Sequence, residues 1–382
     1  MKQNFLSEIF EKFMDELNLK KGKCLGSGGF GLVNEVIVRY INKEFAGKLI
    51  KRDNKIEFNE QNLIKEFRGP NIVRINKIYN KRYYNNEYSL ILMEKAQLKD
   101  LGKFINHLSK NNLLKLIYYP FKIIGDNLIR FFIKQIVECL EFLYRNNFCH
   151  FDIKPGNILI FLNIILKLSD FDLLRDLNEI KDADNNVKIP GGTLGYISPE
   201  FYFNHSHEVS YEESIKYDFF SLGATIFYLN FGKRMLNYKI LENNLLTANY
   251  IFNLLDKAMN EIKSEKLSDK DFIEFLCSLI QFKPKYRPNF EEIYRNKWLN
   301  RNWEEILEIH EINDADEEKL ILELDKSDFL FEKKKYVNKM RNNNEKYYKN
   351  INNDIKKNFI HNNITIKKEK NAFHKHKFIL KI

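Results

Sequence analysis

The spacing of the apolar residues changes along this chain. Residues 19–51 contain short alternating runs such as VNEVIVRY and KEFAGKLIK, and 72–79 and 88–93 repeat this β-like pattern. The later two thirds are dominated by helical spacing, with long apolar helices predicted over 126–147 and 218–231. A strand-rich part followed by a helix-rich part predicts two lobes rather than one mixed sheet.

A glycine-rich segment, LGSGGFGLV, occupies residues 25–33 and places Gly26, Gly28 and Gly31 on a GxGxxG grid. Such spacing lets backbone amides approach phosphates closely. The same grid marks dinucleotide folds, but there it opens a helix. Here an alternating strand follows, so a β-hairpin flap is the better interpretation.

The next predicted strand carries Lys48 in the run Phe45-Ala46-Gly47-Lys48. A lysine on a strand behind a glycine flap can reach the α/β-phosphates of a nucleotide as a point charge. It needs an anion to hold it in place, and Glu60, on the helix predicted over 56–68, is the candidate.

Two polar segments follow buried elements in the second part of the chain. HFDIKPGN covers residues 150–157 and SDFD covers 169–172. Together they offer a carboxylate to orient a hydroxyl (Asp152), a lysine near a transferring phosphoryl group (Lys154), and oxygen ligands for Mg²⁺ (Asn157 and Asp170).

These segments resemble the eukaryotic protein kinases. The resemblance runs from about residue 19 to 299 and includes further ordered matches. GTLGYISPE (192–200) resembles the peptide-receiving segment, DFFSLG (218–223) resembles the central buried helix, and MEKA (93–96) resembles the gatekeeper and hinge. Arg287 matches the arginine that pairs with the glutamate equivalent to Glu200.

The resemblance implies an α+β, bilobal fold: a small antiparallel-sheet N-lobe with one main helix and a larger helical C-lobe. It also implies a kinase that transfers the γ-phosphoryl group of ATP, with Mg²⁺, to Ser or Thr of protein substrates. Lys154 and Thr193 resemble the residues of Ser/Thr kinases at these positions.

Roles then transfer position by position. Asp152 and Lys154 would be catalytic, Asn157 and Asp170 would hold Mg²⁺, and Lys48 with Glu60 would position the phosphates. The adenine would contact backbone of the hinge and apolar side chains. The residues expected to bind nucleotide are Leu25, Gly26, Gly28, Gly31, Val33, Ala46, Lys48, Glu60, Met93, Glu94, Ala96 and Leu159.

The sequence departs from the family pattern before the catalytic aspartate. Phe151 stands where many kinases have an arginine that docks a phosphate on the activation loop. Residues 173–192 contain no Ser, Thr or Tyr, so the acceptor of that phosphate is missing as well. We infer that phosphorylation within this loop does not control activity.

A second departure replaces the glycine of Asp-Phe-Gly by Asp172. Glycine adopts positive φ freely and aspartate does so at a cost, so a flip of Asp170 is expected to be restricted. Asp172 also adds negative charge near the metal site. The alternative function is therefore a nucleotide-binding pseudokinase that acts as a scaffold.

The remaining segments differ in charge. The formal net charge is +10, but residues 302–330 carry −9 and 331–382 carry +11. We predict an N-terminal amphipathic helix (1–18), a kinase domain (19–300; N-lobe to about 95, C-lobe 96–300), an acidic helical appendage (301–330) and a disordered Lys/Asn-rich tail (331–382). The insertion 109–125 has no assigned partner.

Composition limits the location and partners of the protein. Four cysteines without close pairing, no signal-peptide core and no apolar run of about 18 residues predict an intracellular protein, cytoplasmic or nuclear, without a transmembrane segment. Weak binding of nucleic acid or an anionic surface by the 331–382 tail is an alternative role for its charge, beside a solvated tail without a partner.

Overall fold

The computed structural model describes residues 2–28, 31–39, 43–52, 69–110, 126–161, 165–203, 208–236, 252–253, 255–260 and 270–300. Several sequence expectations lie outside these residues: Glu60 and its helix, the insertion beyond residue 110, the acidic segment 301–330 and the basic tail 331–382. The division of the chain at these points stays a prediction.

The N-lobe is built on an antiparallel five-stranded sheet with the order β1-β2-β3-β5-β4. Its strands are β1 (Leu19–Gly28), β2 (Gly31–Val38), β3 (Lys43–Arg52), β4 (Ile75–Tyr83) and β5 (Asn86–Met93). The alternating runs of the sequence account for this arrangement, because successive side chains of a strand point to opposite faces.

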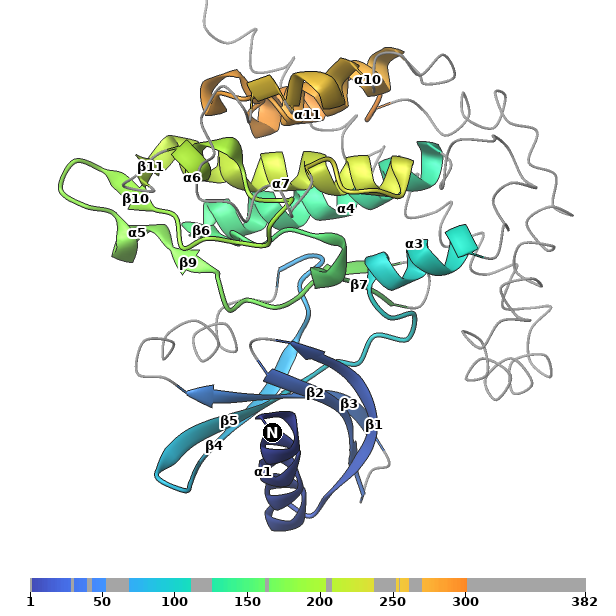
Figure 1. The fold of residues 1–382 in the computed structure, drawn as a ribbon, viewed down its shortest axis with the longest axis vertical. Helices are drawn as coiled ribbons and strands as arrows, with labels where there is room; N and C mark the ends of the chain where they lie inside the picture. The colour runs from blue at the N-terminus through green and yellow to red at the C-terminus, as the bar shows by residue number, and fades with distance from the viewer. Residues whose placement is uncertain are drawn as a thin grey trace, which may run out of the picture. The chain divides into compact units, whose positions relative to one another are not determined.

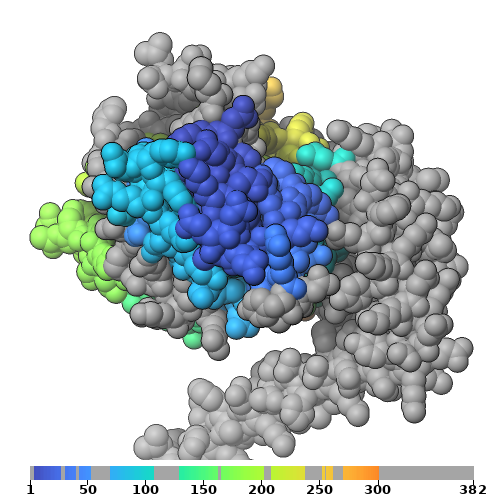
Figure 2. Space-filling model, turned by 90° about the horizontal axis from the view of Figure 1, so that it is seen from below, coloured from blue at the N-terminus to red at the C-terminus, as the bar shows by residue number. Residues whose placement is uncertain are grey.

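Helix α1 (Lys2–Glu16) covers one face of this sheet. Its apolar side chains Ile9, Phe10, Phe13 and Met14 are buried in the same hydrophobic cluster as residues of β1, β2, β3 and β5. The dark-blue surface of α1 lies beside the light-blue β4–β5 hairpin in Figure 2. The helix is therefore part of the N-lobe core.

The C-lobe is mainly helical, as Figure 1 shows. Its longer helices are α3 (Leu101–Lys110), α4 (Asp126–Arg145), α7 (Tyr211–Phe231) and α10 (Lys270–Leu279), with shorter α5 (Leu177–Ile180), α6 (Pro199–Phe203) and α11 (Phe290–Arg295). Their apolar faces share one hydrophobic core with the segments between them.

Three pairs of short strands fix the segments between the helices. They are β6 (Phe148–Cys149) with β9 (Arg175–Asp176), β7 (Ile158–Ile160) with β8 (Leu166–Leu168), and β10 (Asn186–Lys188) with β11 (Glu208–Ser210). The polar segment 150–157 lies between β6 and β7, and the polar segment 169–172 lies between β8 and β9.

Helix α7 runs through the middle of the C-lobe and is buried along most of its length. It begins at Tyr211, seven residues before the start expected from its apolar run. Ser210 caps it by accepting a hydrogen bond from the Glu213 amide, and Glu212 and Glu213 lie in its first turn, where acidic groups favour a helix N-terminus. The predicted start was too late because it was based on the apolar run, which does not include this polar first turn.

The α+β bilobal fold expected from the sequence is confirmed by this sheet and these helices. Among the described helices, none combines the length and apolar character required to cross a bilayer.

Candidate active site

The glycine-rich segment forms a hairpin, as predicted. Strand β1 ends at Gly28, β2 begins at Gly31, and these two residues face each other across the turn. A Cβ atom on Gly31 would lie 2.2 Å from the Leu49 carbonyl oxygen, so only glycine fits there. A Cβ atom on Gly26 would meet nothing within 4 Å, which leaves room beside that backbone for a ligand.

Lys48 lies on β3 and is 7% exposed. It pairs with Val33, while Ala46 pairs with Met93. Because side chains alternate along a strand, these four residues share one face of the sheet. The opposite face belongs to α1, since a Cβ atom on Gly47 would lie 3.3 Å from Phe10 Cζ.

The expected adenine-contacting side chains come from both lobes. Ala46 is buried, whereas Leu25, Val33, Met93 and Leu159 are half-buried. Apolar side chains that keep part of their surface exposed are suited to contact a planar, largely apolar ring. The expected hinge residue Ala96 is also half-buried.

Two adjacent hinge residues form ion pairs with different lobes. The Glu94 carboxylate accepts from Lys167 Nζ on β8 at 2.6 and 2.8 Å. Lys95 donates to Glu35 on β2 and, at 2.8 Å, to Glu44 on β3. Only backbone roles were expected for the hinge, so neither ion pair was predicted from the sequence. The acidic residue in the apolar run VNEV was the one signal available.

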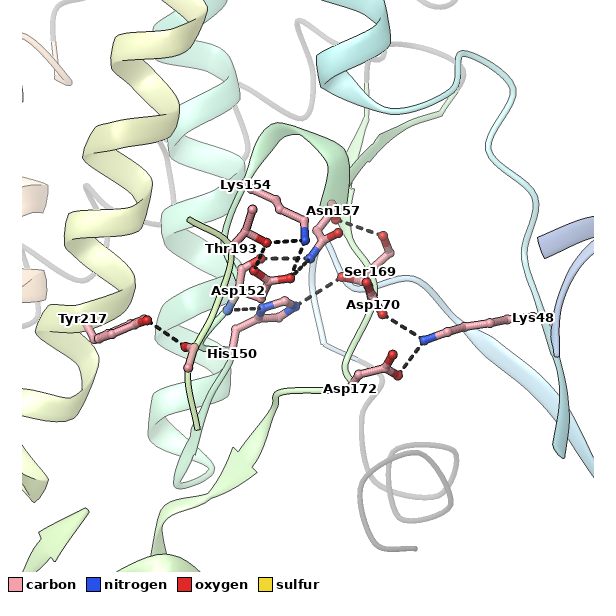
Figure 3. A network of polar contacts seen from close by, with 11 residues as sticks. Lys48, His150, Asp152, Lys154, Asn157, Ser169, Asp170, Asp172, Thr193 and Tyr217 are labelled. Atoms are coloured by element: carbon pink, nitrogen blue, oxygen red, sulfur yellow. Dashed lines mark hydrogen bonds and ion pairs between the residues drawn. The ribbon is translucent and has the colours of Figure 1, made fainter. Parts of the chain in front are cut away.

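Residues 150–157, called the catalytic segment after their expected role, lie in a connected polar network around Asp152, which is 5% exposed (Figure 3). Its Oδ2 accepts from Lys154 Nζ at 2.6 Å and from Asn157 Nδ2 at 2.9 Å. Its Oδ1 accepts from the Thr193 hydroxyl at 2.7 Å, and Lys154 also donates to that hydroxyl at 2.6 Å. The fold thus brings residues 152, 154, 157 and 193 together.

Backbone geometry before Asp152 is fixed by α7. Phe151 adopts a left-handed conformation with φ +62°, and its side chain is fully buried. Asp218 accepts hydrogen bonds from the backbone amides of His150 (2.8 Å) and Phe151 (2.9 Å). These bonds hold the turn in which the next residue, Asp152, presents its carboxylate to the network.

Burial shapes the protonation of this scaffold. It raises the pKa of Asp218 to about 7, against the two backbone amides, which favour the carboxylate. Burial also lowers the pKa of His150, although the neighbouring Asp152 and Asp170 oppose that shift. The imidazole is therefore held neutral beside the catalytic segment.

Asp170 and Asp172 both contact Lys48. Its ammonium donates to Asp170 Oδ1 at 2.8 Å and to Asp172 Oδ1 at 2.5 Å. Although burial raises it, the pKa of Asp170 is held below its ordinary value by Lys48. Burial raises the pKa of Asp172; Lys48 opposes this shift and Asp170 adds to it.

Asp172, which replaces the glycine of the family pattern, does not adopt a left-handed backbone conformation. The residue with positive φ is Asp170, at +64°, and Asp172 is not among the positive-φ residues. The restricted flip of Asp170 expected from this substitution stays a prediction. The carboxylate that Asp172 was expected to add near the metal site is present, and it contacts Lys48.

Asn157 and Asp170 are suited to a hard cation. The Asn157 amide nitrogen donates to Asp152, which leaves its oxygen for another partner, and Asp170 is a carboxylate with 28% of its side chain exposed. Mg²⁺ usually takes one or two protein oxygens and completes its shell with water and substrate phosphates. The donor set present fits this pattern.

Residues 173–192, called the activation segment below, are fixed by backbone pairing and apolar anchors. Strand β9 pairs with β6 and β10 pairs with β11. Within it, Leu174, Leu177, Val187 and Ile189 are buried in the C-lobe core. These apolar anchors were not predicted from the sequence, because their side chains carry no polar group that marks a site.

The predicted pair between Arg287 and Glu200 is present as a buried, bidentate ion pair with both contacts at 2.7 Å. The Arg287 side chain has no exposed surface. This pair ties the end of the peptide-receiving segment to the segment before α11.

Comparison with known proteins agrees with this geometry. A family model described as Protein kinase domain matches residues 19–299. The chain is 29% identical over 296 residues to Aurora kinase of Saccharomyces cerevisiae, which covers 76% of this chain and 72% of that protein.

Two further relatives are more distant. A serine/threonine-protein kinase stk11 homolog of Dictyostelium discoideum is 25% identical over 72% of this chain and 44% of its own length. CBL-interacting protein kinase 12 of Oryza sativa subsp. japonica is 25% identical over 75% of this chain and 48% of its own length. The chain thus matches less than half of these two longer proteins.

The family model covers well over half of the chain, and its range includes the glycine hairpin, the hinge and the Asp152 network in order. This chain belongs to the protein kinase family.

Proposed function

We propose that the protein transfers the γ-phosphoryl group of ATP to serine or threonine hydroxyls of protein substrates. The observation that carries this proposal is the Asp152 network, in which one buried carboxylate is bonded to Lys154, Asn157 and Thr193. The relatives include proteins named as serine/threonine-protein kinases, which supports the choice of acceptor.

Nucleotide binding would use both lobes. Lys48 would hold the α/β-phosphates, with Glu60 as its proposed partner, and the glycine hairpin would cover the phosphates with backbone amides. The hinge backbone at Glu94 and Ala96 would bond the adenine edge. The other residues proposed to contact the nucleotide are Leu25, Gly26, Gly28, Gly31, Val33, Ala46, Met93 and Leu159.

Asn157 and Asp170 would hold Mg²⁺, which when bound neutralises charge on the phosphate oxygens. Asp152 would accept a hydrogen bond from the substrate hydroxyl and orient it toward the γ-phosphoryl group. Lys154 would place its ammonium beside the transferring group and stabilise the charge that develops there. Thr193 would keep these two side chains in register.

A radiolabel transfer assay tests this function. The purified full chain with labelled ATP and Mg²⁺ is expected to label a generic Ser/Thr substrate. Asp152→Asn and Asp170→Ala variants are expected to lose at least about 100-fold in turnover. Asp184→Asn, which removes an exposed carboxylate from the activation segment, is the matched control and should retain activity. Equal labelling by all four proteins would overturn the proposal.

Activity would not depend on phosphorylation of the activation segment. Residues 173–192 hold no hydroxyl side chain, and the segment is anchored by buried Val187 and Ile189. Phe151 is fully buried and cannot bind a phosphate. Phosphatase treatment of the bacterially produced protein should leave its turnover unchanged; a loss of turnover after this treatment would overturn the proposal.

A second candidate function is a nucleotide-binding pseudokinase. The Lys48–Asp172 ion pair favours it, because it occupies the lysine that should meet the phosphates. ATP-dependent thermal stabilisation without label transfer, unchanged in Asp152→Asn, would support this alternative.

We also propose that the protein acts inside the cell, in the cytoplasm or nucleus. The four cysteines are free thiols, and Cys139, Cys149 and Cys277 are buried. Free buried thiols are typical of reducing compartments. Cell fractionation with an antibody against the chain tests this; recovery from the medium alone would contradict it.

A further inference from the structure

Lys48 is held between two carboxylates that lie two residues apart in the sequence (Figure 3). Its Nζ lies 2.8 Å from Asp170 Oδ1 and 2.5 Å from Asp172 Oδ1. The side chains of Lys48 and Asp172 are each only 9% exposed, whereas that of Asp170 is 28% exposed. Asp172 is therefore the closer and more enclosed of these two partners.

The local backbone holds Asp172 in this position. The left-handed conformation of Asp170 turns the chain between the two carboxylates. Arg175 then donates from one guanidinium nitrogen to the carbonyl oxygens of Asp172 (3.0 Å) and Leu174 (2.8 Å). The Asp172 side chain consequently extends from a fixed backbone toward β3.

This arrangement has a cost for phosphate binding. A lysine ammonium has three donors, and two of them point at these carboxylates. To bond both the α- and β-phosphates of a nucleotide, Lys48 has to release or share at least one of these carboxylates, because the ammonium has only one further donor. Asp172 would then stay beside the phosphates as a poorly solvated like charge, which weakens binding.

We propose that Asp172 competes with the nucleotide phosphates for Lys48 and thereby lowers the affinity of this chain for ATP. This inference rests on the proposed nucleotide-binding function of the same site. It assigns Asp172 as a residue that acts through Lys48, and it predicts an effect on phosphate-bearing ligands alone.

The test compares dissociation constants of ATP and adenosine, measured by calorimetry with Mg²⁺ on the full chain. Asp172→Asn keeps the size of the side chain and removes its charge. It is expected to bind ATP at least about fivefold more tightly than wild type, with unchanged affinity for adenosine. Asp172→Glu should bind ATP with wild-type affinity, since its side chain still carries a carboxylate. Asp184→Asn, an exposed carboxylate on the same segment, controls for net charge and should bind ATP as wild type does.

The possible results separate the two proposals. Equal ATP affinity in wild type and Asp172→Asn, or a parallel gain for adenosine, would overturn the competition. Weaker ATP binding by Asp172→Asn at unchanged melting temperature would also overturn it, because Asp172 would then be holding Lys48 in place for the nucleotide. If no protein bound ATP, the proposed function itself would fail and this inference with it.

Discussion

The ring of Phe151 contacts the ring of Tyr217 edge-on, with centroids 5.5 Å apart and planes inclined by 68°. The Tyr217 hydroxyl in turn donates to the Gly191 carbonyl oxygen at 2.7 Å. A Cβ atom on the next residue, Gly192, would lie 2.9 Å from both the Phe151 carbonyl oxygen and the Tyr217 hydroxyl. One tightly packed point therefore joins the catalytic segment, helix α7 and the activation segment.

Tyr217→Phe should separate the hydrogen bond from the aromatic contact. The variant keeps its ring and loses one buried bond, so we expect a loss of about 1 kcal/mol in unfolding free energy. Turnover should fall several-fold, because the lost bond holds Gly191, which lies two residues before Thr193 in the chain. Tyr228→Phe is the control: its hydroxyl bonds Asn106 at 2.9 Å, away from the site. Equal turnover for both variants would contradict this prediction.

Thr193 should matter for turnover more than for nucleotide binding. Thr193→Val keeps the shape of the side chain but leaves Asp152 Oδ1 and Lys154 each without one partner. We expect kcat to fall by about 10- to 100-fold with little change in the KM for ATP. Thr193→Ser restores the hydroxyl and should recover most of the activity; failure of the serine variant to do so would point to the methyl group instead.

The buried ion pair should be a major contributor to stability. Arg287→Ala leaves Glu200, which is 4% exposed, as an uncompensated carboxylate. Breaking such a pair from one side costs about 3–5 kcal/mol in unfolding free energy, measured by denaturant titration. Arg295→Ala removes an exposed arginine paired with Glu291 and should cost less than about 1 kcal/mol. Similar losses of unfolding free energy in the two variants would contradict the prediction that burial makes the Arg287–Glu200 pair the more important one.

Helix α1 should behave as part of the N-lobe. Phe10→Ala and Phe13→Ala remove fully buried rings and should each cost about 3–5 kcal/mol. Phe5→Ala, on the same helix but 39% exposed, should cost less than about 1 kcal/mol. If all three were neutral in thermal unfolding, α1 would be an appendage rather than a core element.

Asp218 should give the protein a specific pH dependence. Its native pKa of about 7 exceeds its ordinary value of 3.8, so the native state retains a proton that the unfolded state releases. The stability from this proton is fully present below pH 3.8 and is lost as the pH rises through about 7. Relative to Asp218→Asn, wild type should lose on the order of 2–4 kcal/mol between pH 4 and 8, measured by denaturant titration.

A constant difference between wild type and Asp218→Asn across this range would contradict a raised pKa.

The sequence was most informative where apolar residues alternate regularly or where motif residues follow each other at family spacing. Alternation predicted β1–β3, and the strand after the glycine grid correctly predicted a hairpin rather than a helix start. The pairing of Arg287 with Glu200 was predicted through the family resemblance alone. Each of these depends on residue type and spacing, which the sequence states directly.

Other features depend on three-dimensional register. The ion pairs of Lys95 with Glu35 and of Glu94 with Lys167 join residues about 60 and 73 positions apart. No local pattern brings such partners together. The backbone conformation of the Asp170–Asp172 turn is a further example: φ is decided by the whole turn, and here Asp170 adopts the left-handed conformation.

The burial of Phe151 also limits how this kinase could change over generations. Replacing it by the arginine common in the family would place a charged group in an apolar site against Tyr217, with no phosphate to neutralise it, because residues 173–192 offer no acceptor. Adding an acceptor first would create a phosphate that the buried Phe151 cannot bind. Either single step is harmful or without effect, so phosphate control could return only through coordinated changes at separate sites.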